Sequence, residues 1–231
     1  MFPLVTPMIV LSVDIGGSSV KAMRSGDPER RSVPSGPEYT PERFRDDLPR
    51  LAGGEPFGAI SIGFPAPVRR GRITREPVNL GPGWTGFDLL AGLGVPCRVV
   101  NDAIMQAIGS YRGDRMLFLG LGTGLGTALI DDYRPIGLEA AHLPFRKGEY
   151  EDYLGARGLE RLGERKWRKR VLEVATLFQA AFVADSVVIG GGNARLLEGE
   201  QLPPGIELGD NRKAFLGGFR LWDREWVTTT A

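Results

Sequence analysis

An acidic residue precedes a glycine-rich turn near the start of the chain. In the stretch DIGGSSVKA, Asp14 is followed by Gly16, Gly17 and Ser18. A turn of this composition can direct several backbone N–H groups and hydroxyls into one phosphate-binding concavity, and glycine allows a close approach. A carboxylate would repel a phosphate unless a cation intervened, so the pattern predicts Mg²⁺ held through Asp14, water and the phosphates. An ordinary hairpin turn with a capping aspartate explains the same residues without any ligand.

A second glycine turn lies in the middle of the chain, in the stretch GLGTGLG from Gly120 to Gly126, where Thr123 adds a hydroxyl donor. It is neither a dinucleotide fingerprint nor a Walker loop, because no GxGxxG opening a helix and no GxxxxGK[ST] can be aligned to it. Each glycine stretch predicts a strand, a tight turn and a second strand, which suggests a duplicated lobe. Two such turns favour a clamp that holds a phosphate chain from two sides.

An amide and a carboxylate end the apolar run VVNDA, at Asn101 and Asp102. Phosphoryl transfer to an alcohol needs a base within hydrogen-bond reach of the attacking hydroxyl, while the rest of catalysis is alignment and charge neutralisation. Asp102 is suited to act as this base. Its alternative role is to cap the helix that follows.

The only histidine, His142, lies three residues after Glu139 in LEAAHLPF. Two such residues are too few for a zinc site, and a lone histidine is more often structural than functional. A sugar, however, offers hydroxyls that both donate and accept, so amide, carboxylate and imidazole groups are its expected complement. Glu151 fits the same description, although its simplest role is that of a solvated acid at the start of a helix.

Candidate strands are rich in Val, Ile and Leu and alternate with helical segments, which predicts an α/β fold. We expect strands at 8–13, 19–23, 59–63, 97–100, 116–120, 126–130 and 186–189. Helices are expected from Asp102 to Tyr111 and from Glu164 to Val183. The second helix carries an apolar stripe that we assign to the core: Trp167, Val171, Val174, Phe178, Ala181 and Phe182. The stretch from Ser25 to Glu55 is expected to form an exposed loop and a short surface helix.

The bulk composition excludes several classes of protein. The chain has 231 residues, of which 42% are hydrophobic, so it can bury a core of one or two domains. Its 29 Lys and Arg nearly balance its 28 Asp and Glu, which argues against a nucleic acid or membrane-surface partner. A single cysteine, Cys97, excludes an internal disulfide and suits the cytoplasm. No apolar run is long enough to span a membrane, and no signal peptide is expected.

Together these motifs resemble those of the ROK family of sugar kinases, in particular its short polyphosphate glucokinase-like branch. The first phosphate motif of the family is matched by DIGGSSVKA. Its Gly-Pro loop on the sugar side resembles SIGFPAPV with the following GRI, and the loop before its catalytic strand resembles NLGPGWTGFDL. The catalytic strand itself resembles VPCRVVNDA. The second phosphate motif resembles FLGLGTGLGTALI, and the Glu-x-Gly-His sugar motif resembles LEAAHL. VVIGGGNA resembles the nucleotide-side glycine motif and GDNRKAFLGGFRLW the C-terminal helix. The motifs follow the family's order and cover most of the chain from Ile9 to Trp222.

The resemblance implies a two-lobed actin-like ATPase fold, ribonuclease H-like, with the active site in the cleft between the lobes. It implies a smaller N-terminal lobe, residues 1–102, and a larger C-terminal lobe, residues 103–231, whose last helix could return to the small lobe. The implied reaction is transfer of a phosphoryl group from ATP or polyphosphate to a hexose hydroxyl, with the 6-OH of glucose as the leading acceptor.

The same resemblance implies roles for individual residues. Asp102 is the general base, and Asp14 lies by Mg²⁺ and reaches it through water. The residues that hold the sugar are Asn101, Glu139, His142 and Glu151. The residues on the side of the phosphates and the donor are Asp14, Gly16, Gly17, Ser18, Lys21, Gly122, Thr123, Gly124, Gly190, Gly191 and Gly192.

Three departures from the family pattern stand out. Ala141 replaces the usual glycine of the sugar motif, and its methyl group could narrow the pocket or shift His142. The zinc-binding cysteine cluster of many members is missing, so no zinc is expected. The segment between the first motif and Ala59 is short, which could trim the small lobe. None of these departures removes a candidate catalytic residue.

The choice between donors and between functional classes stays open at this point. A polyphosphate donor would favour a basic track, which Arg69, Arg70, Arg72 and Arg75 could supply, although a solvated loop explains them as well. A non-catalytic sugar sensor would need a DNA-binding segment, for which there is no room before Met8. A degenerate kinase that binds sugar without turnover is the third alternative. A homodimer is expected from the resemblance alone.

Overall fold

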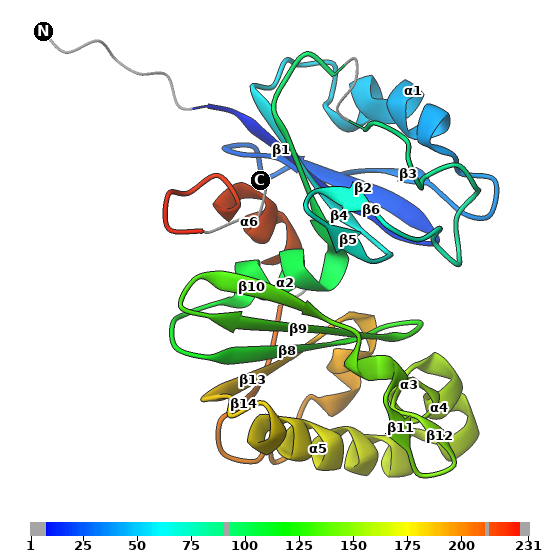
Figure 1. Cartoon of the computed structure of the whole chain (residues 1–231), viewed down its shortest axis with the longest axis vertical. Helices are drawn as coiled ribbons and strands as arrows, with labels where there is room; N and C mark the ends of the chain where they lie inside the picture. Colours follow the sequence, from blue (N-terminus) through cyan, green and yellow to red (C-terminus); the bar gives the residue numbers. More distant parts are fainter. Residues whose placement is uncertain (1–7, 90–92, 211–212, 227–231) are drawn as a thin grey trace, which may run out of the picture. The chain divides into compact units, whose positions relative to one another are not determined.

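The computed structural model describes residues 8–89, 93–210 and 213–226. The chain divides into two compact units. Of the described residues, the first comprises those up to Asp102 together with Gly218–Asp223, and the second comprises Ala103–Gly217 together with 224–226. Each unit is built around one five-stranded sheet (Figure 1).

The sheet of the first unit has the strand order β3-β2-β1-β4-β7. Its strands are β1 (Val10–Ile15), β2 (Ser19–Arg24), β3 (Arg31–Pro34), β4 (Ala59–Phe64) and β7 (Cys97–Asn101). Strands β1, β2 and β3 form an antiparallel meander, while β4 and β7 run parallel to β1. Helix α1 (Pro41–Leu51) and the hairpin of β5 (Val68–Arg69) and β6 (Arg72–Ile73) complete this unit.

The sheet of the second unit has the order β10-β9-β8-β13-β14. Its strands are β8 (Met116–Leu121), β9 (Leu125–Asp131), β10 (Arg134–Leu138), β13 (Ser186–Gly190) and β14 (Ile206–Leu208). Helix α5 (Glu164–Ala181) packs against β8 and β13 (Figure 1). The remaining elements are α2 (Asp102–Ser110), α3 (Glu151–Leu154), α4 (Ala156–Leu162), α6 (Lys213–Arg220), the 3₁₀ helices η1 (Ala140–His142) and η2 (Gly192–Leu197), and the hairpin of β11 (Pro144–Phe145) and β12 (Gly148–Glu149).

The two sheets have the same topology. In each, a three-stranded antiparallel meander is followed by two strands that run parallel to its first strand. The predicted duplication is therefore confirmed. The glycine turns lie at equivalent places, since Gly16–Ser18 connect β1 to β2 and Gly122–Gly124 connect β8 to β9.

All seven predicted strands exist, with shifted ends. The most consequential shift is that β1 begins at Val10 instead of Met8 and continues to Ile15, which places Asp14 inside the strand. Three strands of the five-stranded sheets, β3, β10 and β14, were not expected from the sequence, and neither were the hairpins β5–β6 and β11–β12. The assignment of 25–55 to an exposed loop and surface helix is only partly right, because it contains β3 and because α1 buries Phe44, Leu48 and Leu51.

The apolar stripe of α5 is confirmed with one correction. Trp167, Val171, Val174 and Phe178 are buried, whereas Ala181 is exposed at the end of the helix. Ala175 takes its place in the core, as the helical period requires for a face shared with Val171 and Phe178.

Candidate functional site

The first glycine turn is closed by its own backbone. The N–H of Gly16 donates to the carbonyl of Ser19 at 3.0 Å, so it is used within the turn. The residue after β3, Ser35, holds the turn from outside, since its hydroxyl donates to the Gly16 carbonyl at 2.5 Å and its N–H to the Ser18 carbonyl at 3.2 Å. Among the described residues, the N–H groups of Gly17 and Ser18 find no acceptor. These two groups are therefore the donors that the turn can offer to a phosphate.

Only glycine fits at position 17, because the side chain of Asn79 lies very close to it. A Cβ atom there would lie 2.7 Å from the Cβ of Asn79, a distance that real side chains do not reach. Asn79 belongs to the loop that also contains Trp84, a fully buried residue whose indole N–H donates to the Tyr39 carbonyl at 3.3 Å. The loop NLGPGWTGFDL is thus fixed in the core of the first unit and presses on the glycine turn.

Asp14 pairs with a lysine across the sheet. Its register partner on β2 is Lys21, and its partner on β4 is Gly63. Residues directly opposite each other in an antiparallel pair share one face of the sheet, so the carboxylate and the ammonium group lie on the same side. Burial raises the pKa of the Asp14 carboxyl above its usual 3.8, and the charges of Lys21 and Arg30 only partly offset this.

Asn101 and Asp102 lie at the same sheet edge as Asp14. Gly63 on β4 pairs with Asp14 on one side and with Val100 on the other. Asp14 and Val100 are therefore about 10 Å apart, with β4 between them. Asn101 follows as the last residue of β7, and its side-chain amide donates to the Ala66 carbonyl at 3.3 Å. Asp102 is the first residue of α2. The parallel strands therefore bring the predicted base and the predicted metal residue to one edge.

The second glycine turn is supported from two sides. The N–H of Gly122 donates to the Gly124 carbonyl at 3.1 Å within the turn. The side chain of Asn193 donates to the Gly122 carbonyl at 3.2 Å, and the N–H of Ala156 donates to the Thr123 carbonyl at 3.1 Å. In the part of the chain that the structure describes, the N–H groups of Thr123 and Gly124 find no acceptor, so they match Gly17 and Ser18 of the first turn.

Glu151 lies against this second turn. Its Oε2 accepts a hydrogen bond from the N–H of Leu125 at 3.0 Å, and a Cβ on Gly124 would lie 2.3 Å from the same oxygen. The sequence predicted Glu151 as a sugar ligand. The structure places one of its oxygens at the predicted phosphate turn.

The glycines from 190 to 192 adjoin the same turn. Gly190 ends β13, in register with Gly120 on β8, and Gly191 has a φ of 85°, a conformation that favours glycine. A Cβ on Gly191 would lie 2.4 Å from the Leu121 carbonyl oxygen. Asn193, which follows them, supplies the bond to the turn and was missed by the sequence analysis. Its place directly after the three glycines is the signal that could have revealed it.

His142 lies among three acidic side chains. Its Nδ1 is 2.9 Å from Oε2 of Glu149, and its Nε2 is 3.8 Å from Oε2 of Glu139. The hydrogen bond to Glu149 is the main cause that raises the pKa of His142, and the charges of Glu151, Glu149 and Glu139 add to it. Glu149 was also missed by the sequence analysis. Ala141, the departure from the family motif, has its methyl group buried in the core of the second unit.

The predicted residues thus gather into two sets, one in each unit. The first set contains Asp14, Lys21, the turn 16–18 and the pair 101–102. The second set contains the turn 122–124, the glycines 190–192, Glu151 and the His142 cluster. No group of three or more His, Cys, Asp or Glu that could hold a metal ion occurs in the described residues. A Mg²⁺ ion at Asp14 would therefore need oxygens of its phosphate ligand and water to complete its coordination.

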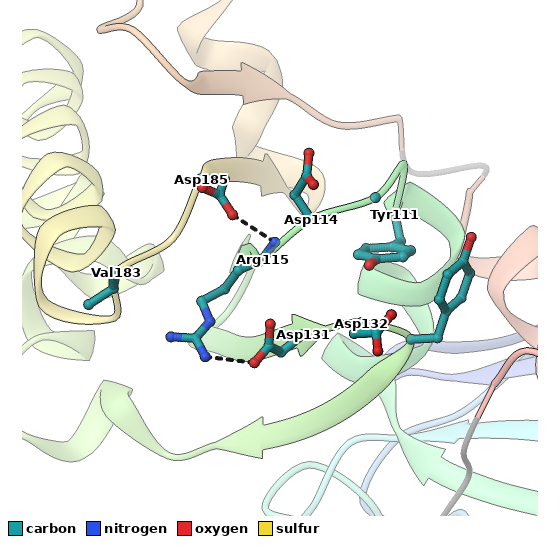
Figure 2. A pocket seen from close by; sticks show the side chains of 9 residues that line it. Tyr111, Asp114, Arg115, Asp131, Asp132, Val183 and Asp185 are labelled. Atoms are coloured by element: carbon teal, nitrogen blue, oxygen red, sulfur yellow. Dashed lines mark hydrogen bonds and ion pairs between the residues drawn. The ribbon is translucent and has the colours of Figure 1, made fainter.

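A separate cavity of about 520 Å³ opens in the second unit (Figure 2). Arg115 lies between two aspartates there. Its side chain donates to Asp131 at 2.6 Å and its N–H to Asp185 at 2.9 Å. The cavity is lined by Tyr111, Gly113, Asp114, Arg115, Asp131, Asp132, Tyr133, Val183 and Asp185, none of which is a predicted site residue. Arg115 ties the start of β8 to the end of β9, which is a structural task.

Within the described ranges, no helix is both long and apolar enough to cross a lipid bilayer.

No protein-family model matches the sequence. No curated protein matches it either. Solved structures, by contrast, match over nearly the whole chain. The inorganic polyphosphate/ATP-glucomannokinase from Arthrobacter sp. strain KM is 22% identical, with a TM-score of 0.77 over 91% of this chain and 96% of that one.

Two further structures show the same agreement. The ROK hexokinase from Thermus thermophilus is 22% identical, with a TM-score of 0.64 over 91% of this chain and 96% of that one. The ROK family glucokinase from Streptomyces griseus, solved with glucose and AMPPNP, is 18% identical, with a TM-score of 0.70 over 90% and 97%. The chain therefore has the α/β fold of the ROK sugar kinases, as the sequence motifs predicted.

Proposed function

We propose that the chain is a sugar kinase that transfers a phosphoryl group from ATP or polyphosphate to a hexose hydroxyl, with the 6-OH of glucose as acceptor. One observation carries this proposal. Two sheets of identical topology present a glycine turn at the same place, and each turn leaves two adjacent N–H groups without an acceptor among the described residues. Paired N–H groups of this kind bind phosphate oxygens, and two such sites suit a donor with several phosphates.

The acids of the first unit separate this proposal from simple phosphate binding. Asp102 acts as the general base that accepts the proton of the attacking hydroxyl. Asp14 holds Mg²⁺ through water; the ion, when bound, neutralises charge on the phosphates. Burial disfavours the charged form of the Asp14 carboxyl, and a cation bound beside it would favour that form.

The remaining roles follow the chemistry of each group. Asn101 and the cluster of Glu139, His142 and Glu151 bind sugar hydroxyls, since these side chains offer both donors and acceptors. Lys21 and the two glycine turns contact the donor. The matching structures support this assignment, because they include a glucokinase and a polyphosphate/ATP-glucomannokinase.

The test is a sugar panel. The purified protein, with Mg²⁺, receives each sugar with ATP in one tube and polyphosphate in another, and mass spectrometry detects sugar phosphates. We expect glucose 6-phosphate, and an Asp102→Asn variant with kcat lower by about 10²- to 10⁴-fold. Asp46→Asn, an exposed aspartate on α1, is the matched control and should keep wild-type kcat. Glucose that binds without being phosphorylated would replace this proposal with a sensor or a degenerate kinase.

The hairpin of β5 and β6 bears on the choice of donor. Arg69, Arg70, Arg72 and Arg75 are all exposed, and none of them forms an ion pair with another described residue. We propose that they steer the polyphosphate chain. Changing all four to Gln should lower kcat/KM for polyphosphate about tenfold or more and that for ATP much less. The control neutralises four exposed cations of helices α4 and α5: Arg157, Arg165, Lys166 and Lys169. Equal losses with both donors would refute the steering role.

Two further properties belong to the proposal. The enzyme is a homodimer, as the family resemblance implies, and light scattering that gives a monomer mass would overturn this. It acts in the cytoplasm, which suits the single, unpaired Cys97.

A further inference from the structure

We infer that Glu149 is a positioning residue for sugar binding: it fixes the ring orientation and the tautomer of His142. This inference rests on the proposed function, since it assigns a partner to a residue proposed to bind the sugar. The observation is the 2.9 Å contact between Nδ1 of His142 and Oε2 of Glu149. A carboxylate at one ring nitrogen keeps the proton there, so the other nitrogen of the neutral ring becomes an acceptor.

The hairpin that carries Glu149 is rigidly built. The N–H of Glu149 donates to the Asp152 carboxylate at 3.0 Å, and the N–H of Tyr150 donates to the Leu143 carbonyl at 3.2 Å. Phe145 stacks on Tyr150 with ring centroids 4.4 Å apart. The carboxylate therefore reaches His142 from a fixed backbone, as a residue that orients another must.

The other ring nitrogen of His142 is left for a ligand. Its Nε2 lies 3.8 Å from Oε2 of Glu139, which is too long for a good hydrogen bond. Both side chains are about half exposed, at 53% and 57%. A sugar hydroxyl can enter there and donate to Nε2 of the neutral ring, while a neighbouring hydroxyl of the same sugar donates to the Glu139 carboxylate.

Protonation of the ring changes this arrangement. Three acidic groups face His142: Glu149 on β12, Glu139 before η1 and Glu151 on α3. The protonated ring donates from both nitrogens and can no longer accept from the sugar. The KM for the sugar should therefore rise as the pH falls through the pKa of His142, which lies above 6.5.

The single histidine makes the test direct, because every imidazole signal in a nitrogen-15 NMR spectrum belongs to His142. In the wild type we expect the Nδ1–H tautomer at high pH. Glu149→Gln should keep that tautomer, since its amide oxygen still accepts the Nδ1 proton, and should lower the pKa by removing the charge. Glu149→Ala should lower the pKa of His142 as well and should also lose the preference for the Nδ1–H tautomer. Glu160→Gln, an exposed glutamate on α4, is the control and should leave the spectrum unchanged.

Sugar binding is measured in the same variants by calorimetry and by kinetics. At pH 8 we expect the sugar KM of Glu149→Ala to rise about tenfold with little change in kcat, the equivalent of about 1.4 kcal/mol, and that of Glu149→Gln to stay near wild type. The acid limb of the KM profile should move to lower pH in Glu149→Gln. An unchanged tautomer and pKa in Glu149→Ala, or an unchanged KM, would overturn the inference. Failure of the wild type to phosphorylate any sugar would overturn the proposed function instead, because the NMR readout does not depend on turnover.

Discussion

The two glycine turns occupy the same place in two sheets of the same topology, yet their surroundings differ. The turn of the first unit follows a half-buried aspartate and is pressed by the side chain of Asn79. In the second unit Gly120 stands where the first unit has Asp14, and the tip of the Glu151 side chain contacts the turn. The two units thus share the backbone of the turn, while the side chains beside it differ. The difference between the turns therefore lies in their side-chain surroundings, which the predictions below address one by one.

Among variants that distinguish the two turns, we expect a substitution of Asp14 to have the largest effect on activity. We expect Asp14→Asn to lower kcat by at least about 100-fold, or about 3 kcal/mol, because the residue proposed to hold Mg²⁺ is lost. The same variant should unfold at a higher temperature than the wild type at pH 7, because it has no ionised carboxylate buried away from water at this position. A variant that loses both activity and stability would contradict this assignment.

The pH dependence of that stability follows from the sign of the shift. The folded-state pKa of Asp14 is raised, so the folded protein binds this proton more tightly than the unfolded chain does. Its stability should therefore fall as the pH rises from below 3.8 through the folded-state pKa, by about 1.4 kcal/mol for each unit of pKa difference. Urea titrations of wild type and Asp14→Asn should diverge as the pH is raised from 4 to 7.

The next effect compares the glycines themselves. Gly17→Ala should destabilise the protein by about 1–3 kcal/mol, because its Cβ meets the Cβ of Asn79, which cannot move without the backbone. Gly124→Ala should cost less, since its Cβ meets the flexible end of Glu151. Thermal unfolding measures both variants. Asn79→Gly should rescue Gly17→Ala, and equal losses in the two alanine variants would show that the surroundings of the turns do not differ in rigidity.

The smallest effect concerns the acid at the second turn. Glu151→Ala should lower the free energy of unfolding by about 1 kcal/mol, because the N–H of Leu125 loses its acceptor. Glu151→Gln keeps an acceptor oxygen and should stay close to wild type. If the two variants behave alike in urea titrations, the contact with Leu125 contributes nothing measurable to the turn.

The sequence allowed the elements that face the core to be predicted, because apolar runs of Val, Ile and Leu have the periodicity of buried strands. It revealed the edge strand β7 but not the edge strands β3, β10 and β14. Strand β3, RSVP, buries only one side chain, and β10, RPIGL, contains both Pro and Gly, so neither carries a strand pattern. Such strands form because a neighbouring strand offers hydrogen bonds, a condition that only the folded sheet supplies.

The candidate site was predictable to the extent that its residues form local motifs. The glycine turns and the Asn101–Asp102 pair could be found by their composition and spacing. Glu149 and Asn193 could not, because each acts on a partner that folding brings near: His142 across a short hairpin, and a turn 71 residues away along the chain. Nothing in the residue type of a surface glutamate marks it as the partner of a histidine.

The segment Gly218–Asp223, which lies late in the chain, belongs to the first unit, and this bears on how the protein is made. Trp222 donates to the hydroxyl of Ser61 at 2.8 Å and lies under the guanidinium of Arg98, and the Gly218 carbonyl accepts from the same serine at 2.6 Å. Ribosomes release the chain from its N-terminus, so the first unit cannot be completed while it is being translated. The sheet of the second unit is continuous in sequence from Met116 to Leu208, so it can form before this segment is made. The first unit therefore depends on residues that are synthesised after the whole sheet of the second unit.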